Sequence, residues 1–261
     1  MEIVDQIFSE SIRVKSHEVD SFNKAHPLYY FQLMQEVAGC HAYQRDMGIP
    51  QLLKKGKTWV VTRTKMRFYD YVEWPGSITV ETWPQKPWKF YFPRVCRAFD
   101  SDKTLLFESL SHWVVVDTST GRPVKPENFP FMEIPKNEPV IIDPDLGKRV
   151  QFNNSQDSTL IEYHPQILYC DIDLNLHVNN VAYLQWILDS LCFSFRDEYK
   201  LQEVDITYIA QAFRDDKLVI YSNKLENEES VTFSHQVNRL DQDNETTQLC
   251  NAETKWIKKT Q

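Results

Sequence analysis

The sequence contains no C-x-x-C pair, and its five cysteines, at positions 40, 96, 170, 192 and 250, are odd in number. This pattern indicates neither a disulfide framework nor a zinc site, and it is typical of a protein in a reducing compartment. No apolar run approaches the roughly 18–20 residues of a membrane helix, and residues 1–14 are too polar for a signal peptide. We therefore expect a cytoplasmic protein without a membrane span.

Positive charge is also scarce. The 29 lysines and arginines are outnumbered by 37 acidic residues, which gives a formal net charge of -8. Because neutralising phosphates requires a basic surface, this balance argues against a nucleic-acid partner. The 261 residues, 42% of them hydrophobic, are sufficient for one large domain or two ordinary halves.

A strand–helix–sheet pattern occurs twice along the chain. Residue 19 matches residue 172, and the helical run from Tyr30 matches the run from Tyr183 at the same offset. In the first copy, we expect a strand over 8–19, a helix over 28–45, and strands from 59 and over 77–83, 88–100 and 104–117. In the second copy, we expect strands near 203–210, 217–224, 230–240 and 247–258. A helix followed by antiparallel strands predicts a duplicated α+β fold.

Prolines separate the two copies. Six of the 13 prolines lie within residues 118–160. Because proline removes a backbone donor and restricts the residue before it, we expect little regular structure there. The predicted organisation is therefore an N-terminal unit over 1–117, a linker over 118–160 and a C-terminal unit over 161–261.

Residues 171–180 are the densest run of polar chemistry in the chain. Asp173, Asn175 and His177 place a carboxylate, an amide and an imidazole within five residues. Asn179 and Asn180 then suit the N-cap of a helix, and apolar residues follow at helical spacing. The run predicts a loop that leads into a helix N-terminus, where backbone N–H groups and the helix dipole favour developing negative charge.

This run closely resembles the D-x-N-x-H-V-N-N motif of the acyl-ACP thioesterases. Residues 181–190 resemble the helix that follows the motif in that family. A second match to the family lies far away in the chain, at residues 58–63 and 78–84. The resemblance implies a tandem (double) hot-dog fold, with two long helices each wrapped by an antiparallel sheet. It also implies hydrolysis of fatty acyl-ACP to free fatty acid and holo-ACP, with acyl carrier protein as the partner. The lack of a visible transit peptide favours a bacterial member.

Thioester hydrolysis requires an aimed, partly deprotonated water and a held oxyanion. The thiolate leaves readily, since a cysteine-like thiol has a pKa of ~8.5. His177 and Asp173 are the candidate base pair, because imidazole ionises near neutral pH. Asn175 can position water or donate to the oxyanion. The alternative is that these three residues only hold a turn and cap a helix.

The chain departs from the family in the strand after this helix. There, family members carry a glutamate and some of them a cysteine, whereas this chain has Gln211 and Ala212. An amide cannot act as a base and alanine cannot act as a nucleophile. The base role therefore falls to His177 or Asp173, and Gln211 keeps a supporting role in the site. Cys192 is expected as a small buried residue within the helix and offers no replacement.

Neither a metal nor a cofactor is expected. Asp171, Asp173 and Asn175 mimic the opening of an EF-hand loop, but Leu176 and Ala182 occupy its sixth and twelfth positions, which require glycine and glutamate. In the first copy, a polar loop over 20–26 that contains Asp20, Asn23 and His26 echoes the motif with altered spacing. We interpret it as a relic in a unit that shapes the acyl pocket.

A run of basic residues precedes and enters the strand from residue 59. Arg63, Lys65 and Arg67 share one face of that strand because side chains alternate, and three lysines over 54–57 precede them. Residues 51–67 contain no acidic residue. This run is a candidate docking surface for the strongly acidic acyl carrier protein; the alternative is a solvated sheet face.

Two other functions stay open from the sequence. The chain could act on acyl-CoA instead of acyl-ACP, or it could bind acyl groups without catalysis because Gln211 replaces the glutamate. Acyl chain length is also open, as is the choice between a monomer and a homodimer.

Overall fold

The computed structural model describes residues 6–128, 135, 147–153, 160–226, 230–241 and 245–259. It divides into two compact units, unit 1 over Met1–Leu146 and unit 2 over Gly147–Gln261. The boundary lies inside the stretch that the prolines predict as a linker. Much of that stretch (129–134, 136–146 and 154–159) lies outside the described residues.

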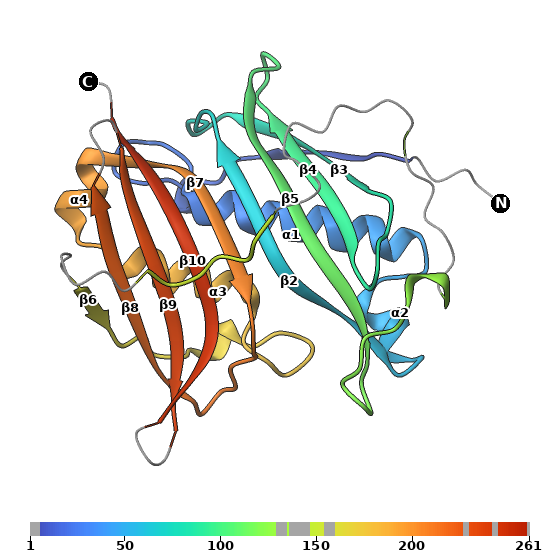
Figure 1. Cartoon of the computed structure of the whole chain (residues 1–261). Coiled ribbons are helices and arrows are strands. Elements are labelled where there is room, and N and C mark those ends of the chain that lie inside the picture. The colour runs from blue at the N-terminus through green and yellow to red at the C-terminus, as the bar shows by residue number, and fades with distance from the viewer. Residues whose placement is uncertain are drawn as a thin grey trace. The chain divides into compact units, whose positions relative to one another are not determined.

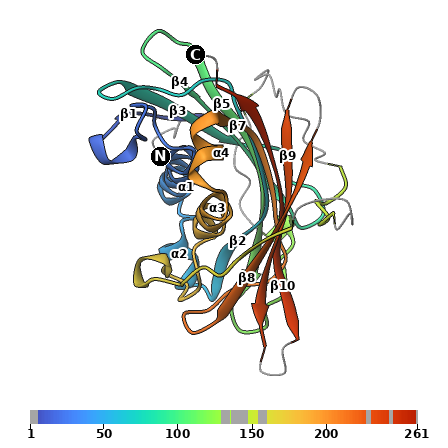
Figure 2. The ribbon, with the colours of Figure 1, turned by 90° about the vertical axis from the view of Figure 1, so that its left-hand side faces the viewer.

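Unit 1 is one helix packed on an antiparallel sheet whose strand order is β1-β3-β4-β5-β2 (Figure 1). Figure 2 shows α1 on one face of these strands, and α1 contacts β1 and β3 among other elements of the unit. The elements are β1 (Phe8–Arg13), η1 (Ser16–Glu18), α1 (Pro27–Gln44), α2 (Ile49–Leu53), β2 (Lys57–Phe68), β3 (Ser77–Pro84), β4 (Phe92–Phe99), β5 (Leu105–Asp117) and η2 (Pro126–Asn128).

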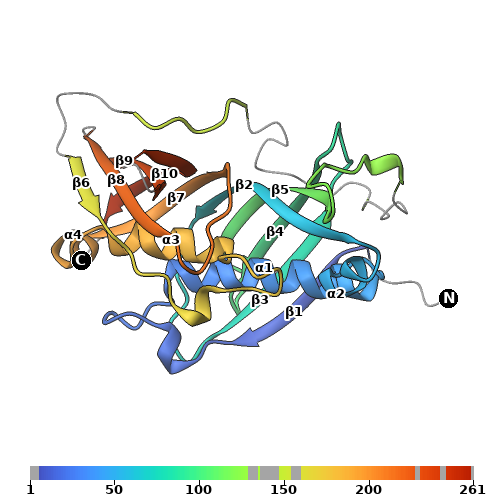
Figure 3. The same ribbon diagram turned by 90° about the horizontal axis from the view of Figure 1, so that it is seen from below.

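Unit 2 repeats this topology. Its antiparallel order is β6-β8-β9-β10-β7, so each strand takes the place of the strand five earlier in the chain. Helix α3 contacts β8, and Figure 3 shows the helix and the strand crossing each other. The elements are β6 (Leu160–Tyr163), η3 (Tyr169–Asp171), α3 (Asn180–Asp189), α4 (Phe193–Glu198), β7 (Tyr199–Tyr208), β8 (Lys217–Glu226), β9 (Val231–Leu240) and β10 (Thr246–Lys258). The predicted tandem α+β fold is confirmed.

Helix α1 begins where its sequence favours a start and is buried on several sides. Pro27 occupies the first turn, where its missing N–H is not needed. Tyr30 is fully buried, and its ring lies edge-on to Phe68 on β2 (5.9 Å) and Phe107 on β5 (5.6 Å). In unit 2, Tyr183 lies edge-on to Tyr208 in the same way, at 5.7 Å. Such aromatic pairs add stability beyond the area that they bury.

The second helix is shorter than the first and ends before Cys192. Helix α3 has 10 residues against 18 in α1. The Ser190 hydroxyl donates to the carbonyl of Ile187 (2.7 Å), which satisfies a carbonyl of the last turn. Cys192 then adopts an extended backbone before α4 and is exposed. The prediction that Cys192 is buried within the helix is therefore wrong.

No helix among the described residues is long and apolar enough to cross a membrane.

Candidate functional site

The carboxylate of Asp173 organises the polar loop of unit 2. Its Oδ1 accepts the backbone N–H of Asn175 (2.8 Å) and lies 3.4 Å from the backbone N of His177. Its Oδ2 lies 3.5 Å from Nδ2 of Asn175. These contacts form an Asx-type turn. Asp173 therefore positions His177 through its backbone rather than through a bond to the imidazole.

The loop leads into α3 as its asparagines predict. The Oδ1 of Asn179 accepts the N–H of Val181 (2.9 Å), which caps the helix. The backbone N–H of Asn179 donates to Asp171 (2.7 Å), and that of Val178 donates to Ala212 (3.0 Å). Two of the three donors expected over 178–180 are thus already bonded. Within the described part of the chain, neither the backbone N–H nor the buried Nδ2 of Asn180 has an acceptor.

A second loop, over residues 209–216, contacts the first. Ala212 is fully buried, and its N–H donates to the hydroxyl of Tyr183 on α3 (2.9 Å). The ring of Phe213 then lies edge-on to the imidazole of His177, with ring centroids 5.1 Å apart and an angle of 73° between the planes. Phe213 was missed by sequence reasoning, because no periodicity or motif pairs positions so far apart in the chain.

Gln211 lies in this second loop but is exposed. Its side chain makes no hydrogen bond to another residue that the structure describes. The structure therefore brings Asp173, Asn175 and His177 together in one turn, and it places Gln211 two residues before the ring that contacts His177. The supporting role of Gln211 stays a prediction.

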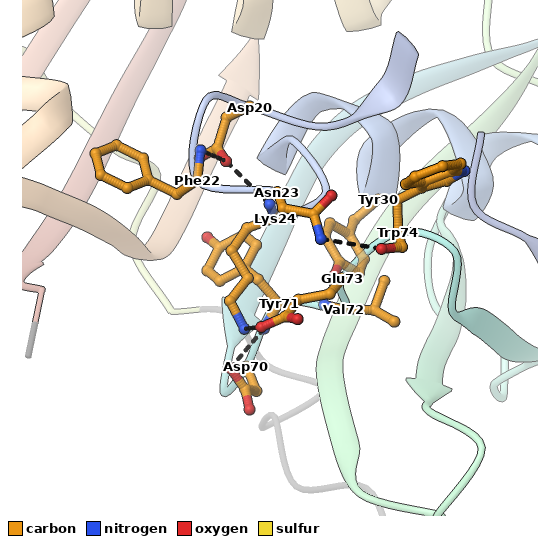
Figure 4. A network of polar contacts seen from close by, with 10 residues as sticks. All are labelled: Asp20, Phe22, Asn23, Lys24, Tyr30, Asp70, Tyr71, Val72, Glu73 and Trp74. Carbon is orange, nitrogen blue, oxygen red and sulfur yellow. Dashed lines mark hydrogen bonds and ion pairs between the residues drawn. The ribbon is translucent and has the colours of Figure 1, made fainter. Parts of the chain in front are cut away.

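Unit 1 contains the same turn, built from different side chains (Figure 4). Oδ1 of Asp20 accepts the N–H groups of Phe22 (2.9 Å) and Lys24 (3.0 Å), as Asp173 does in unit 2. Asn23 and Leu176 both have φ of 62° at the same place in the two turns. Asparagine tolerates this backbone better than leucine does, so the turn of unit 2 carries more strain.

In each unit, the turn is also hydrogen-bonded to a second loop, which contains Val72 in unit 1 and Ala212 in unit 2, and the bonds follow the same pattern. In unit 1, the N–H of Ala25 donates to the carbonyl of Val72 (2.9 Å), and the N–H of Val72 donates to the hydroxyl of Tyr30 (2.8 Å). Val178, Ala212 and Tyr183 make the equivalent bonds in unit 2. The repeat seen in the sequence therefore extends to individual hydrogen bonds.

Two thiols of unit 2 differ in their availability. Cys250 is fully buried, and burial raises the pKa of its thiol, so a reactive thiolate is disfavoured. A hydrogen bond with Ser194 lowers the pKa of the exposed Cys192. Among the described residues, no group of three or more His, Cys, Asp or Glu side chains is arranged to hold a metal ion.

The predicted docking residues are less exposed than a solvated face requires. Arg63, Lys65 and Arg67 do share the face of β2 opposite Met66 and Phe68, but Arg63 is only 7% exposed. Each of the three cations already has a partner of its own. Lys54 and Lys55, at the end of α2, are exposed.

Comparison with known proteins identifies the fold class first. An acyl-ACP thioesterase from Bacteroides thetaiotaomicron superposes with a TM-score of 0.82 at 20% identity, covering 96% of this chain and 98% of that one. A 12:0-ACP thioesterase from Umbellularia californica superposes with a TM-score of 0.81 at 21% identity, covering 97% and 95%. These likenesses establish the double hot-dog fold.

Family models then identify the family. The acyl-ACP thioesterase N-terminal domain matches residues 5–128, and the acyl-ACP thioesterase C-terminal domain matches residues 152–258. The chain belongs to the acyl-ACP thioesterase family. A palmitoyl-acyl carrier protein thioesterase of Gossypium hirsutum is 27% identical over 228 residues, or 81% of this chain. The match covers 54% of that relative, so the chain spans about half its length.

Proposed function

We propose that the protein hydrolyses the thioester of fatty acyl-ACP and releases free fatty acid and holo-ACP. Family membership supports this reaction class. The observation that carries the proposal is the placement of His177, on a turn held by Asp173 and directly before the N-terminus of α3. A partly buried imidazole at a helix N-terminus combines a proton acceptor with nearby donors for an oxyanion.

In the proposed mechanism, His177 accepts a proton from a water molecule while the water oxygen attacks the thioester carbon. The carbonyl oxygen becomes an oxyanion, which Nδ2 of Asn175 and the backbone N–H of Asn180 are candidates to hold. Collapse of the tetrahedral intermediate breaks the carbon–sulfur bond. The thiolate that leaves recovers a proton from the imidazolium, so His177 returns to its starting state. Asp173 keeps the turn in place, and Gln211 has a supporting role beside it.

Acyl carrier protein is the proposed partner, and the basic run over 51–67 is its proposed docking surface. The exposed end of this run, Lys54 and Lys55, suits a partner rich in carboxylates. We also propose a cytoplasmic location, because all five cysteines are free.

The test of the reaction is free-thiol release from a panel of acyl-ACP and acyl-CoA substrates. His177→Ala should lower kcat by about 10²-fold or more, which is the usual contribution of a general base. The matched control is His164→Ala, because His164 lies directly after β6 in the same unit and outside the loop. Equal activity in wild type and His177→Ala would overturn the assignment of the base.

The panel and one further variant separate the alternatives. Faster turnover by Gln211→Glu would show that the native site works without a second carboxylate. Preference for acyl-CoA over acyl-ACP would point to the other carrier. If wild type binds acyl-ACP without releasing thiol, the protein is an acyl-binding protein instead of an enzyme.

A further inference from the structure

The two units share one scaffold but place different side-chain pairs on it. In unit 1, Nζ of Lys24 forms an ion pair with Oε1 of Glu73 at 2.9 Å (Figure 4). The equivalent positions in unit 2, fixed by the matching hydrogen bonds of the two turns, are His177 and Phe213. In both units, the scaffold thus brings one residue of the second loop into contact with the turn. In unit 1 the contact is the ion pair of Glu73 with Lys24, and in unit 2 it is the ring contact of Phe213 with His177.

The backbone around Phe213 is held on both sides. Ala212 is bonded through its N–H to Tyr183 and through its carbonyl to Val178. The N–H of Phe213 donates to Oδ2 of Asp216 (2.8 Å), and Asp216 lies 3.6 Å from Nη1 of Arg239. The ring nevertheless stays 45% exposed, so burial alone does not account for its placement. Among the described residues, its ring packs against the imidazole of His177.

We propose that Phe213 is a positioning residue, whose ring holds the imidazole of His177 in the orientation that accepts a proton from water. This inference rests on the proposed function, in which His177 is the base. An aromatic edge contact restrains the imidazole without adding a net charge. A carboxylate at the same place, as Glu73 is in unit 1, would attract the imidazolium and keep the ring protonated before water arrives.

The proposal is tested with Phe213→Leu and with the conservative variant Phe213→Tyr. Loss of the ring in Phe213→Leu should lower kcat about fivefold with KM changed less than twofold, because the effect is on orientation rather than on substrate binding. Phe213→Tyr keeps a ring and should stay within twofold of wild type. The control is Phe193→Leu, since Phe193 is 85% exposed at the start of α4 and lies outside the loops of the site.

Nuclear magnetic resonance supplies a readout that does not need turnover. The imidazole protons of His177, assigned by their loss in His177→Ala, should carry a ring-current shift in wild type and Phe213→Tyr. That shift should disappear in Phe213→Leu. If it does not change, the ring contact is absent in solution and the proposal fails, whatever the activity.

Two kinetic outcomes would also overturn the proposal. A rise in KM at unchanged kcat would make Phe213 part of the substrate-binding wall, and full activity in Phe213→Leu would make the ring dispensable. Failure of the proposed function is seen separately, as a wild-type protein that releases no thiol while the ring-current shift is present.

Discussion

His235 on β9 is a fully buried histidine whose hydrogen bonds fix it in one neutral form. Its Nε2 lies 2.8 Å from the hydroxyl of Thr254, which also accepts the indole N–H of Trp256. Its Nδ1 lies 2.7 Å from the hydroxyl of Ser222, which lies 3.2 Å from Ser190. Because Ser190 donates to a carbonyl of α3, the hydroxyls have one consistent order, with the proton of His235 on Nδ1.

This burial has a consequence for acid stability. Burial lowers the pKa of His235 from 6.5 to about 3, so the folded state binds fewer protons than the unfolded state between these values. The free energy of unfolding therefore has its full value, as far as His235 is concerned, above about pH 6.5, and it decreases as the pH falls from there toward 3. Between pH 7 and pH 5, this group should remove about 2 kcal/mol from the free energy of unfolding.

Urea unfolding at the two pH values measures the effect, with His235→Gln as the variant that cannot titrate. His235→Gln should lose about 2 kcal/mol less than wild type over this range. His164→Gln is the control, because it removes a largely exposed histidine of the same unit and leaves His235 in place. Parallel loss in wild type and His235→Gln would contradict the prediction.

At the scale of elements, the repeated turns are the feature that relates structure to activity. Asp20 and Asp173 bond the same two backbone N–H groups of their turns. The turns therefore depend on their aspartates for the same physical reason, which is that the carboxylate is the acceptor that holds these N–H groups within the turn. Unit 1 has Lys24 at the position of its turn where unit 2 has His177, so stability and activity can be separated between the two units.

Replacing each aspartate by alanine tests this separation. Asp20→Ala and Asp173→Ala should each lower the free energy of unfolding by about 1–2 kcal/mol, measured by denaturant unfolding. Thiol release per folded molecule should fall only in Asp173→Ala. If Asp20→Ala lowers activity as much as Asp173→Ala does, the turn of unit 1 is more than a relic.

At the scale of the whole molecule, charge is arranged by sheet register as well as by composition. Glu81, Arg97, Glu108 and Arg67 stand side by side on β3, β4, β5 and β2, with alternating sign. Arg97 bonds Glu81 at 2.8 Å. Burial raises the pKa of Glu108, and the two arginines oppose this rise. Arg67 is therefore part of a cross-strand ladder, which leaves the exposed lysines of the basic run as the better docking candidates.

Charge reversal tests the docking surface. Lys54→Glu combined with Lys55→Glu should raise KM for acyl-ACP about fivefold at low salt, and less at high salt because screening weakens surface attraction. KM for a minimal acyl thioester without the carrier protein should not change. Lys103→Glu is the control, because Lys103 is exposed just before the start of β5, at the opposite end of that strand from Lys54 and Lys55. An equal rise for both substrates would remove the docking proposal.

Features that depend on near neighbours in the chain could be predicted from the sequence alone. The strand–helix–sheet order, the duplication and the polar loop ending at an asparagine cap all follow from local spacing, because periodicity, capping and turn formation act over a few residues. Helix α1 begins at Pro27 and ends at Gln44, within one residue of its predicted bounds. The grouping of Asp173, Asn175 and His177 follows in the same way.

Contacts between residues far apart in the chain, in contrast, became visible in the fold. The contact of Phe213 with His177, the burial of Arg63 and the exposure of Cys192 depend on strand register and on where a helix stops. Local spacing carries no information about these pairs, because they are set by packing between segments far apart in the chain. For the same reason, the sequence indicated that Gln211 belongs near the site, while the fold placed Phe213 against the imidazole.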